Sequence, residues 1–168
     1  MKDWENKYFF TRLVWLFPLA FVFHIMEESN GFAYWVTNVL KGEMDVRVFY
    51  VNNAMFMLVL LGLTALAYKK QNQLFTFLLF LWVTGQQFWN FVFHIYTQFQ
   101  FNAYSPGYFT AIFLYFPIFL YLSYLAIRDN HLLFRHWLIC FFIGFWGMAF
   151  TIWSGLYHFG KFPLDKWF

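Results

Sequence analysis

Five long apolar stretches constrain this chain more than any other feature of its sequence. A helix needs about 20 predominantly apolar residues to cross the hydrocarbon core of a bilayer. The chain offers such stretches one after another, at Tyr8–Glu28, Val48–Tyr68, Leu74–Phe99, Tyr108–Ile127 and Phe134–Tyr157. The sequence therefore predicts an all-α integral membrane protein, built as a bundle of about five transmembrane helices.

The composition agrees with lipid as the solvent. Of the 168 residues, 62% are hydrophobic and 11% are charged, whereas soluble domains carry about 25% charged residues. A small soluble domain cannot hide that much apolar surface in one core. The first stretch is the weakest candidate because it contains Arg12 and Pro18. A long arginine side chain can reach the interface, and membrane helices tolerate a proline kink.

Several classes of protein are excluded by what the chain lacks. The connections are short and no repeat or low-complexity linker appears, so residues 1–168 are predicted to form a single polytopic transmembrane domain. One cysteine, Cys140, rules out an internal disulfide framework. The formal charge of +3 is spread thinly, so nucleic-acid binding is not expected. The mixed charges of residues 1–7 argue against a secretory signal peptide.

Basic residues near the helix ends favour a cytoplasmic N-terminus in a multi-pass protein. Seven fall on the side of the N-terminus and four on the opposite side. The seven are Lys2, Lys7, Arg12, Lys69, Lys70, Arg128 and Arg135, and the four are Lys41, Arg47, Lys161 and Lys166. The longest connection, residues 29–47, contains an aromatic segment that suggests an interfacial element or a lid.

Histidines and acids within the predicted spans gather at one level of the membrane. Ionisable residues in membrane spans are costly and are functional candidates. His24, Glu27 and Glu28 close the first span, three and four residues apart, so all three can share one helix face. Alternating helix directions bring other polar residues to the same side. These are Asn52, Asn53, His94, Ser105, Thr110, Tyr157 and His158. Other polar residues follow two of the spans, as the stripe Gln87, Asn90, His94 and Gln98 in the third and as Thr151 and Ser154 in the fifth.

Each part of this pattern also has an ordinary structural explanation. A histidine at a helix end is often interfacial, and Glu27 and Glu28 could cap the membrane boundary. Thr151 and Ser154 could make interhelical hydrogen bonds, which are worth up to about 2 kcal/mol each. Three segments far apart in sequence each deliver a histidine or acid to one level, however, and this favours a functional site. His131 and His136 fall on the opposite side and are interpreted as loop residues.

The string His24-Ile25-Met26-Glu27-Glu28, at the end of a first membrane span, resembles the bacterial HXXEE family of small polytopic membrane proteins. Two later blocks are similar as well, Asn-x-x-x-His at Asn90–His94 and Pro-Gly-x-x-Thr at Pro106–Thr110. The resemblance covers nearly the whole chain and implies the bacterial cytoplasmic membrane. The family has no assigned function, so the resemblance implies no substrate. It marks His24, Glu27, Glu28, Asn90, His94 and Thr110 as the important positions.

The first functional hypothesis is a metal-dependent membrane enzyme. Imidazoles and carboxylates are the ligands of zinc and of non-haem iron. The expected metal ligands are His24, Glu28, His94 and His158, and an uncoordinated glutamate, Glu27 or Glu28, would act as general base on a metal-bound water. Asn90 would orient a ligand or polarise a carbonyl, and Thr110 joins these catalytic candidates through the resemblance. The substrate would be a membrane lipid or another lipophilic molecule, and the reaction would resemble hydrolysis; a pair of metals would suit oxygen chemistry better.

Two other classes stay open. Metal-free acid/base catalysis, such as lipid isomerisation, needs only one buried glutamate and one histidine facing an apolar pocket. A transporter or a subunit of a membrane complex needs no catalysis at all. Small size and the lack of repeats weigh against a transporter, although an oligomer would compensate. The polar residues crowd toward one side, which favours a pocket over a channel.

Overall fold

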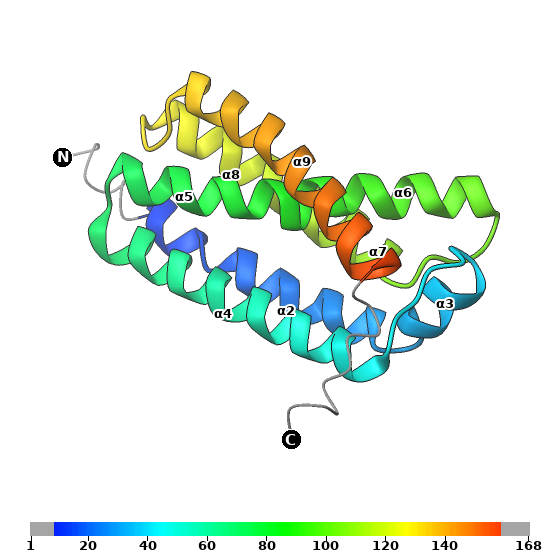
Figure 1. Ribbon diagram of the computed structural model, residues 1–168. Coiled ribbons are helices and arrows are strands. Elements are labelled where there is room, and N and C mark those ends of the chain that lie inside the picture. Colours follow the sequence, from blue (N-terminus) through cyan, green and yellow to red (C-terminus); the bar gives the residue numbers. More distant parts are fainter. Residues whose placement is uncertain (1–8, 159–168) are drawn as a thin grey trace.

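The computed structural model describes residues 9–158, and every regular element in that range is a helix (Figure 1). The predicted all-α fold is confirmed. In chain order the elements are α2 (Leu16–Glu28), α3 (Phe32–Asn38), α4 (Val46–Lys70), α5 (Gln73–Val83), the π-helical turn η1 (Thr84–Trp89), α6 (Asn90–Phe101), α7 (Tyr108–Thr110), a second π-helical turn η2 (Ala111–Tyr115), α8 (Phe116–Arg128) and α9 (Phe134–Tyr157).

Four helical segments are long and apolar enough to cross a membrane. They are Phe9–Glu28, Val46–Lys70, Tyr108–Arg128 and Phe134–Tyr157. The remaining predicted span is also helical, since α5, η1 and α6 follow one another without a gap from Gln73 to Phe101. It is not among the four because Gln86, Gln87 and Asn90 lower the mean hydropathy of its central turns.

Pro18 explains a break near the start of the first segment. Proline has no N–H, so Pro18 cannot donate to the carbonyl of Val14. Phe17 N donates to that carbonyl instead, over 3.2 Å, and residues 14–15 form a turn before α2 begins. The segment continues as a helix after the turn, as expected for a tolerated proline.

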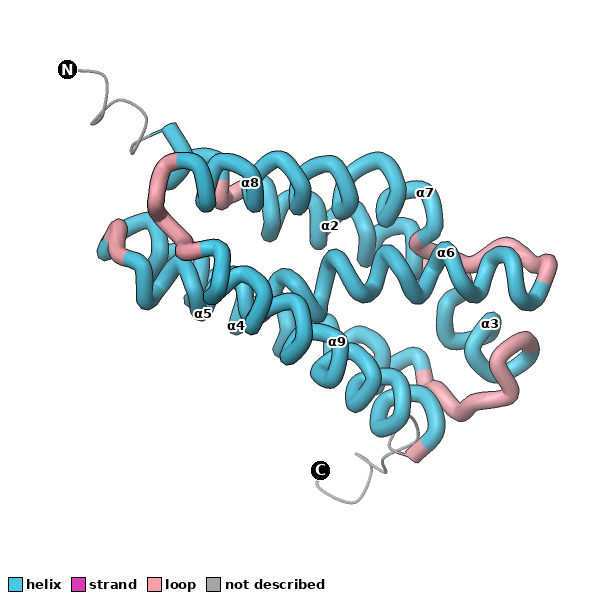
Figure 2. Tube along the Cα trace, turned by 90° about the horizontal axis from the view of Figure 1, so that it is seen from above, coloured by secondary structure: helices cyan, strands magenta, loops and turns pink. Residues whose placement is uncertain are grey.

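The long helices lie side by side, with their connections gathered at two ends of the bundle (Figures 1 and 2). One end holds the α4–α5 and α8–α9 turns, and the other holds α3 and the α6–α7 connection. Between them, aromatic and aliphatic side chains from α2, α5, η2 and α8 form the main core. Its fully buried members include Phe17, Leu79, Phe80, Tyr115, Phe119 and Leu122.

A glycine pair lets η1 and α9 approach closely. A Cβ atom on Gly144 would lie 2.8 Å from Gly85 N, and a Cβ on Gly85 would lie 3.1 Å from Gly144 O. Small residues of this kind allow membrane helices to bring their backbones together. The contact fixes where α9 crosses the polar middle of the α5–η1–α6 run.

The connection at residues 29–47 is folded rather than loose. Its helix α3 places Phe32, Trp35 and Val36 in a second, smaller core with Phe49 and Leu156. This supports an interfacial element that is anchored to α4 and α9.

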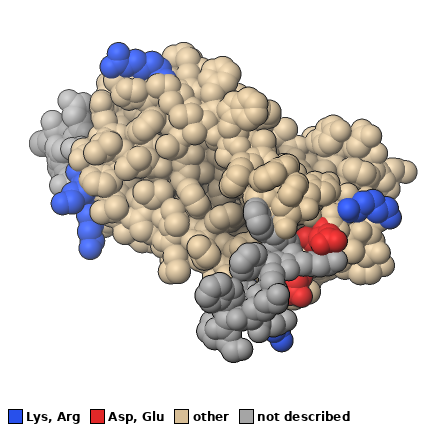
Figure 3. All heavy atoms as spheres, in the orientation of Figure 1, with Lys and Arg blue, Asp and Glu red and all other residues tan. Residues whose placement is uncertain are grey.

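Charged side chains avoid the middle of the bundle on the face drawn in Figure 3. A broad band without them separates the two ends, as expected for a surface in contact with hydrocarbon. Lys69 and Lys70 occupy the last turn of α4, at the end that also holds Arg128. Tyr8 and four of the basic residues used for the orientation, Lys2, Lys7, Lys161 and Lys166, fall outside the described residues.

Candidate metal centre

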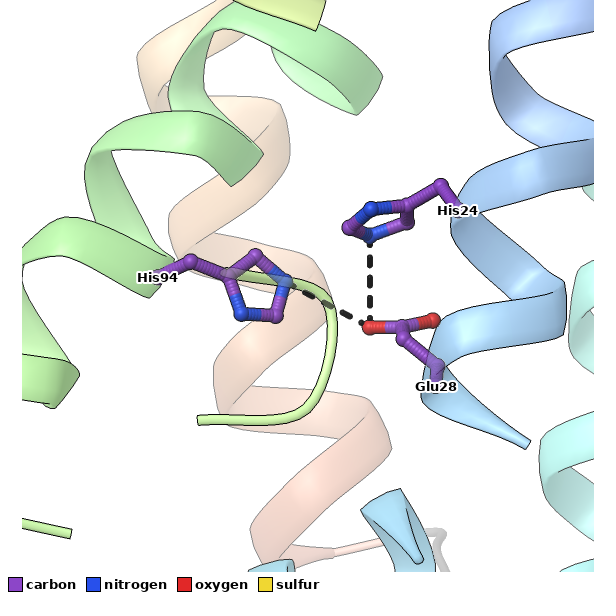
Figure 4. A group of neighbouring side chains, drawn as sticks. All are labelled: His24, Glu28 and His94. Carbon is purple, nitrogen blue, oxygen red and sulfur yellow. Dashed lines mark ion pairs between the residues drawn. The ribbon is translucent and has the colours of Figure 1, made fainter. Parts of the chain in front are cut away.

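His24, Glu28 and His94 converge at the end of the bundle that holds α3 (Figure 4). Glu28 Oε1 lies 3.4 Å from His24 Nε2 and 3.4 Å from His94 Nε2. One ligand atom from each residue lies within 4.8 Å of the other two. The exposed fractions of the three residues are only 1%, 5% and 0%, so all three side chains are buried.

Helix periodicity explains half of this arrangement. His24 and Glu28 are four residues apart on the last turns of α2, so they lie on one face. His94 comes from α6, which runs past the end of α2, and its ring lies edge-on to His24 with 5.0 Å between centroids. The sequence predicted that these three residues would meet, and the structure brings them together.

A hydrogen-bond chain determines which nitrogen of His24 carries a proton. The Thr110 hydroxyl donates to Glu27 Oε2 over 2.6 Å, in preference to the Gly107 carbonyl at 3.2 Å, because a carboxylate is the stronger acceptor. That hydroxyl has one hydrogen, so it must accept from His24 Nδ1, 2.9 Å away. The lone pair of neutral His24 is therefore on Nε2 and faces Glu28.

Glu27 supports this chain and does not act at the cluster. Its carboxylate accepts from the backbone N–H groups of Phe109 and Thr110, at 3.1 and 2.7 Å, and from the Tyr104 hydroxyl at 2.5 Å. Burial and the bond to Glu27 raise the pKa of Tyr104, which keeps the phenol protonated as a donor. An acid at the first turn of a helix is favourable. The prediction of Glu27 as an uncoordinated general base does not fit this geometry, since both oxygens are engaged.

His94 is also held through its Nδ1, by residues that the sequence did not single out for this role. Its Nδ1 lies 2.9 Å from Ser105 Oγ. Ser105 N donates to Gln98 Oε1 over 2.9 Å, and the Thr97 hydroxyl lies 3.2 Å from the Ser105 hydroxyl. Gln98, a member of the polar stripe on α6, therefore holds the loop that carries Ser105.

Gly107 allows that loop to pass directly beside both imidazoles. Its φ of +100° lies in the left-handed region, which favours glycine. A Cβ at this position would lie 2.7 Å from Cε1 of His24 and 2.7 Å from Cε1 of His94. The Pro106-Gly107 dipeptide marks this position in the sequence, but the sequence alone does not show that the loop touches the two imidazoles.

Two imidazoles and a carboxylate are a possible ligand set for zinc or iron. Among the described residues, neither His24 Nε2 nor His94 Nε2 has a hydrogen-bond partner. His24 Nε2 and His94 Nε2 both lie 3.4 Å from Glu28 Oε1 in a buried site, where either a cation between the three groups or a proton on one of them would compensate the charge of the carboxylate. Two Zn–ligand bonds of about 2.0–2.1 Å at a tetrahedral angle separate their ligand atoms by roughly 3.3 Å. The two 3.4 Å contacts match that separation.

A family model described as a protein of unknown function with an HXXEE motif matches residues 15–122. This chain belongs to the HXXEE family. The motif letters correspond to His24, Glu27 and Glu28, and the matched range also contains His94, Ser105, Gly107 and Thr110. Searches of curated proteins and of solved structures found no match.

The prediction that His158 would join the cluster is wrong for this HXXEE protein. His158 is exposed, its Nδ1 lies 2.8 Å from the Trp153 carbonyl, and its ring packs on Trp153. The end of α9 instead contacts the loop before α4, where Leu156 O accepts from Glu43 N over 2.6 Å and the Tyr157 hydroxyl donates to Leu40 O. The inclination of α9 in Figure 1 takes its end away from α6.

Other predicted polar residues have local roles. The Thr151 hydroxyl donates to the Gly147 carbonyl and the Ser154 hydroxyl to the Phe150 carbonyl, both within α9. Within the described chain, these two residues therefore do not make the interhelical hydrogen bonds that were expected of them. Gln87 Nε2 donates to Phe17 O and ties η1 to α2. At the opposite end, His131 lies in the loop between α8 and α9 as interpreted, but it is buried and stacks on Phe10. His136 belongs to the first turn of α9 and not to the loop.

The cluster borders a cavity of about 750 Å³. His24 and Glu28 belong to its wall, together with three predicted polar residues, Asn52, Asn53 and Asn90. Asn90 Oδ1 is buried and has no hydrogen-bond partner within the described range. The arrangement thus joins a buried His/Glu cluster to a space large enough for a small molecule.

Proposed function

We propose that this HXXEE protein is a metal-dependent membrane enzyme that acts on a lipophilic substrate in a hydrolase-like reaction. The ligands would be His24 Nε2, His94 Nε2 and Glu28 Oε1, and the ion would be zinc or iron. One observation carries the proposal: two buried imidazoles and a buried carboxylate present one ligand atom each to a common point, and the Thr110 hydroxyl holds His24 in the tautomer that a metal needs.

Three protein ligands leave a coordination position open, as in catalytic zinc sites. A metal in such a site polarises a carbonyl and lowers the pKa of a bound water to about 7. The chain's own residues would hold the substrate. His24 and Glu28 are at the cavity wall, and Asn90 lies one helical turn before His94, where its side chain can orient a substrate carbonyl. Thr110 and Ser105 would act as positioning residues by holding the two rings.

Metal-free acid/base catalysis is the second candidate, and the contacts of Glu28 favour it. A carboxylate that lies 3.4 Å from two imidazoles can share a proton with either of them. The adjoining cavity would again hold the substrate. This candidate predicts full activity in the presence of chelators and no stoichiometric metal.

Metal analysis of detergent-purified protein distinguishes the two. With zinc or iron supplied and no chelator used, the wild type should retain about one equivalent, and His94→Ala should lose most of it, because ligand number sets affinity. His158→Ala is the matched control and should retain the metal, since His158 lies outside the cluster. Less than roughly a tenth of an equivalent of zinc, iron or manganese in the wild type would exclude the metal proposal.

A further inference from the structure

The cavity beside the cluster is elongated along the bundle. On α4 its wall runs from Phe49 to Leu63. Fourteen residues of α-helix span about 21 Å at 1.5 Å per residue. The opposite walls are formed by α5, η1 and α6 on one side and by α9 from Ile143 to Leu156 on the other. A space of this length and of about 750 Å³ fits a molecule with a long chain.

The two ends of the cavity differ in polarity. His24, Glu28, Asn52 and Asn53 line the end at the metal-centre level. The other end is lined by Leu63, Leu78, Leu81 and Trp82, with no polar group except the indole nitrogen. A ligand that satisfies both ends has a polar head beside Glu28 and an apolar tail that points toward the α4–α5 turn.

The charge of the cavity restricts the head group. Of the described residues in the wall, Glu28 alone carries a formal charge and none is lysine or arginine. In the metal-free protein, a phosphate or carboxylate head would therefore enter a low-dielectric space beside a carboxylate, with no basic side chain to pair with it. Gln86 and Asn90 are also in the wall. Both polar side-chain atoms of Gln86 and Oδ1 of Asn90 are buried and lack a partner in the part of the chain that is described. Gln86 Nε2 can donate to a carbonyl, and Gln86 Oε1 and Asn90 Oδ1 can accept from an amide N–H group.

We propose that the cavity binds one long-chain acyl lipid with a neutral ester or amide head. Its head lies at the end of the cavity that holds Glu28, and its chain extends along α4. The proposal names a substrate class for the proposed enzyme. Only the reaction, and not the binding of the lipid, rests on the proposed function. Binding itself requires no metal, so the two proposals can fail separately.

Gly147 provides a way to fill the cavity without straining the fold. It lines the cavity from α9, and a Cβ added there would meet nothing within 4 Å. Leucine at this position would project into the space that the acyl chain needs. Gly62 on α4 is the matched control, because it also has open space around a Cβ, is exposed, and does not line the cavity.

The experiment measures binding of 9,10-dibromo-octadecanamide to metal-free protein in detergent. Bromine quenches tryptophan fluorescence on contact, and Trp82 is in the cavity wall. Trp82→Phe identifies the part of the signal that comes from the cavity. Octadecanamide and octadecyl phosphate, which share a chain but differ in head charge, then compete with the probe.

Octadecanamide should displace the probe at roughly tenfold lower concentration than octadecyl phosphate, since the phosphate head loses its solvation without gaining a partner. Gly147→Leu should weaken probe binding by about tenfold or more, and Gly62→Leu should bind as the wild type does. Equal competition by the two lipids, or unchanged binding by a folded Gly147→Leu protein, would overturn the proposal. If the protein binds the probe in this way but takes up no metal, the result would support the acyl-lipid cavity and exclude the metal enzyme.

Discussion

At the scale of the residue, Thr110 has the clearest consequence for the proposed metal centre. Its hydroxyl joins His24 Nδ1 to Glu27 and so directs the Nε2 lone pair toward Glu28. Thr110→Val keeps the shape and removes both bonds. We expect zinc affinity to fall by about 10- to 100-fold, as for other partners that orient a metal-bound histidine. Zinc titration in detergent measures it, and Thr110→Ser should restore most of the affinity. Unchanged affinity in the valine variant would show that the hydroxyl does not orient His24.

Gly107→Ala tests whether the loop must touch both imidazoles. The substitution adds a methyl group 2.7 Å from Cε1 of each histidine, at a φ of +100°. We expect a loss of unfolding free energy of roughly 1–3 kcal/mol, from strain and overpacking together, and a loss of metal. Gly31→Ala is the control for strain alone, because Gly31 has a φ of +133° but nothing within 4 Å of its Cβ position. Thermal unfolding and metal content of both variants decide the question, and equal effects would exclude a role for the contact.

The sequence predicted the centre of the site better than its surroundings. His24 and Glu28 could be paired by helix spacing, and His94 could be placed at their level by counting helices. Glu27 and Glu28 could not be told apart, because residues three and four positions after His24 both share its face. The structure separates them, since only Glu27 faces the N-terminal turn of α7. His158 was misplaced because sequence gives the level of a helix end and not the inclination of the helix.

At the scale of the element, glycine contacts set the position of α9. Gly144→Ala would place a Cβ 2.8 Å from Gly85 N and 3.0 Å from the Thr84 side chain. We expect thermal unfolding to show a loss of about 1–3 kcal/mol. Gly147→Ala, one turn later and with open space, should be neutral or should stabilise the helix by up to about 1 kcal/mol. The opposite order of stability would mean that η1 and α9 do not pack through this pair.

The helical stretches were predictable, whereas their irregular turns were not. An apolar run of about 20 residues predicts a membrane span because its side chains are more stable in hydrocarbon than in water, whatever the rest of the fold. No local pattern announces the π-helical turn η1, whereas η2 ends two residues before Pro117, which lacks the N–H that a regular helix would use there. They have consequences for the site, because η1 directs Gln87 to the Phe17 carbonyl while Gln86 lines the cavity. Such turns often occur at functional sites.

At the scale of the whole molecule, charge should set the orientation of the bundle. Among the described residues, Arg12, Lys69, Lys70, Arg128 and Arg135 lie at one end, and Lys41 and Arg47 lie at the other. Loops rich in lysine and arginine stay in the cytoplasm. We therefore expect the α4–α5 turn to be cytoplasmic and the His/Glu cluster to lie near the opposite surface.

Single cysteines test this orientation, and the chain suits the method because its one native cysteine, Cys140, is buried. Lys70 and Arg128 are exposed at the first end, and Asn38 and Phe101 are exposed at the second. In intact cells, a maleimide that cannot cross the membrane should label Asn38→Cys and Phe101→Cys, while Lys70→Cys and Arg128→Cys should react only after the cells are opened. The reverse pattern would invert the bundle and place the cluster on the cytoplasmic side. Labelling at both ends of one helix would exclude the membrane-spanning arrangement, because a helix such as α4 can reach both surfaces only by crossing the bilayer.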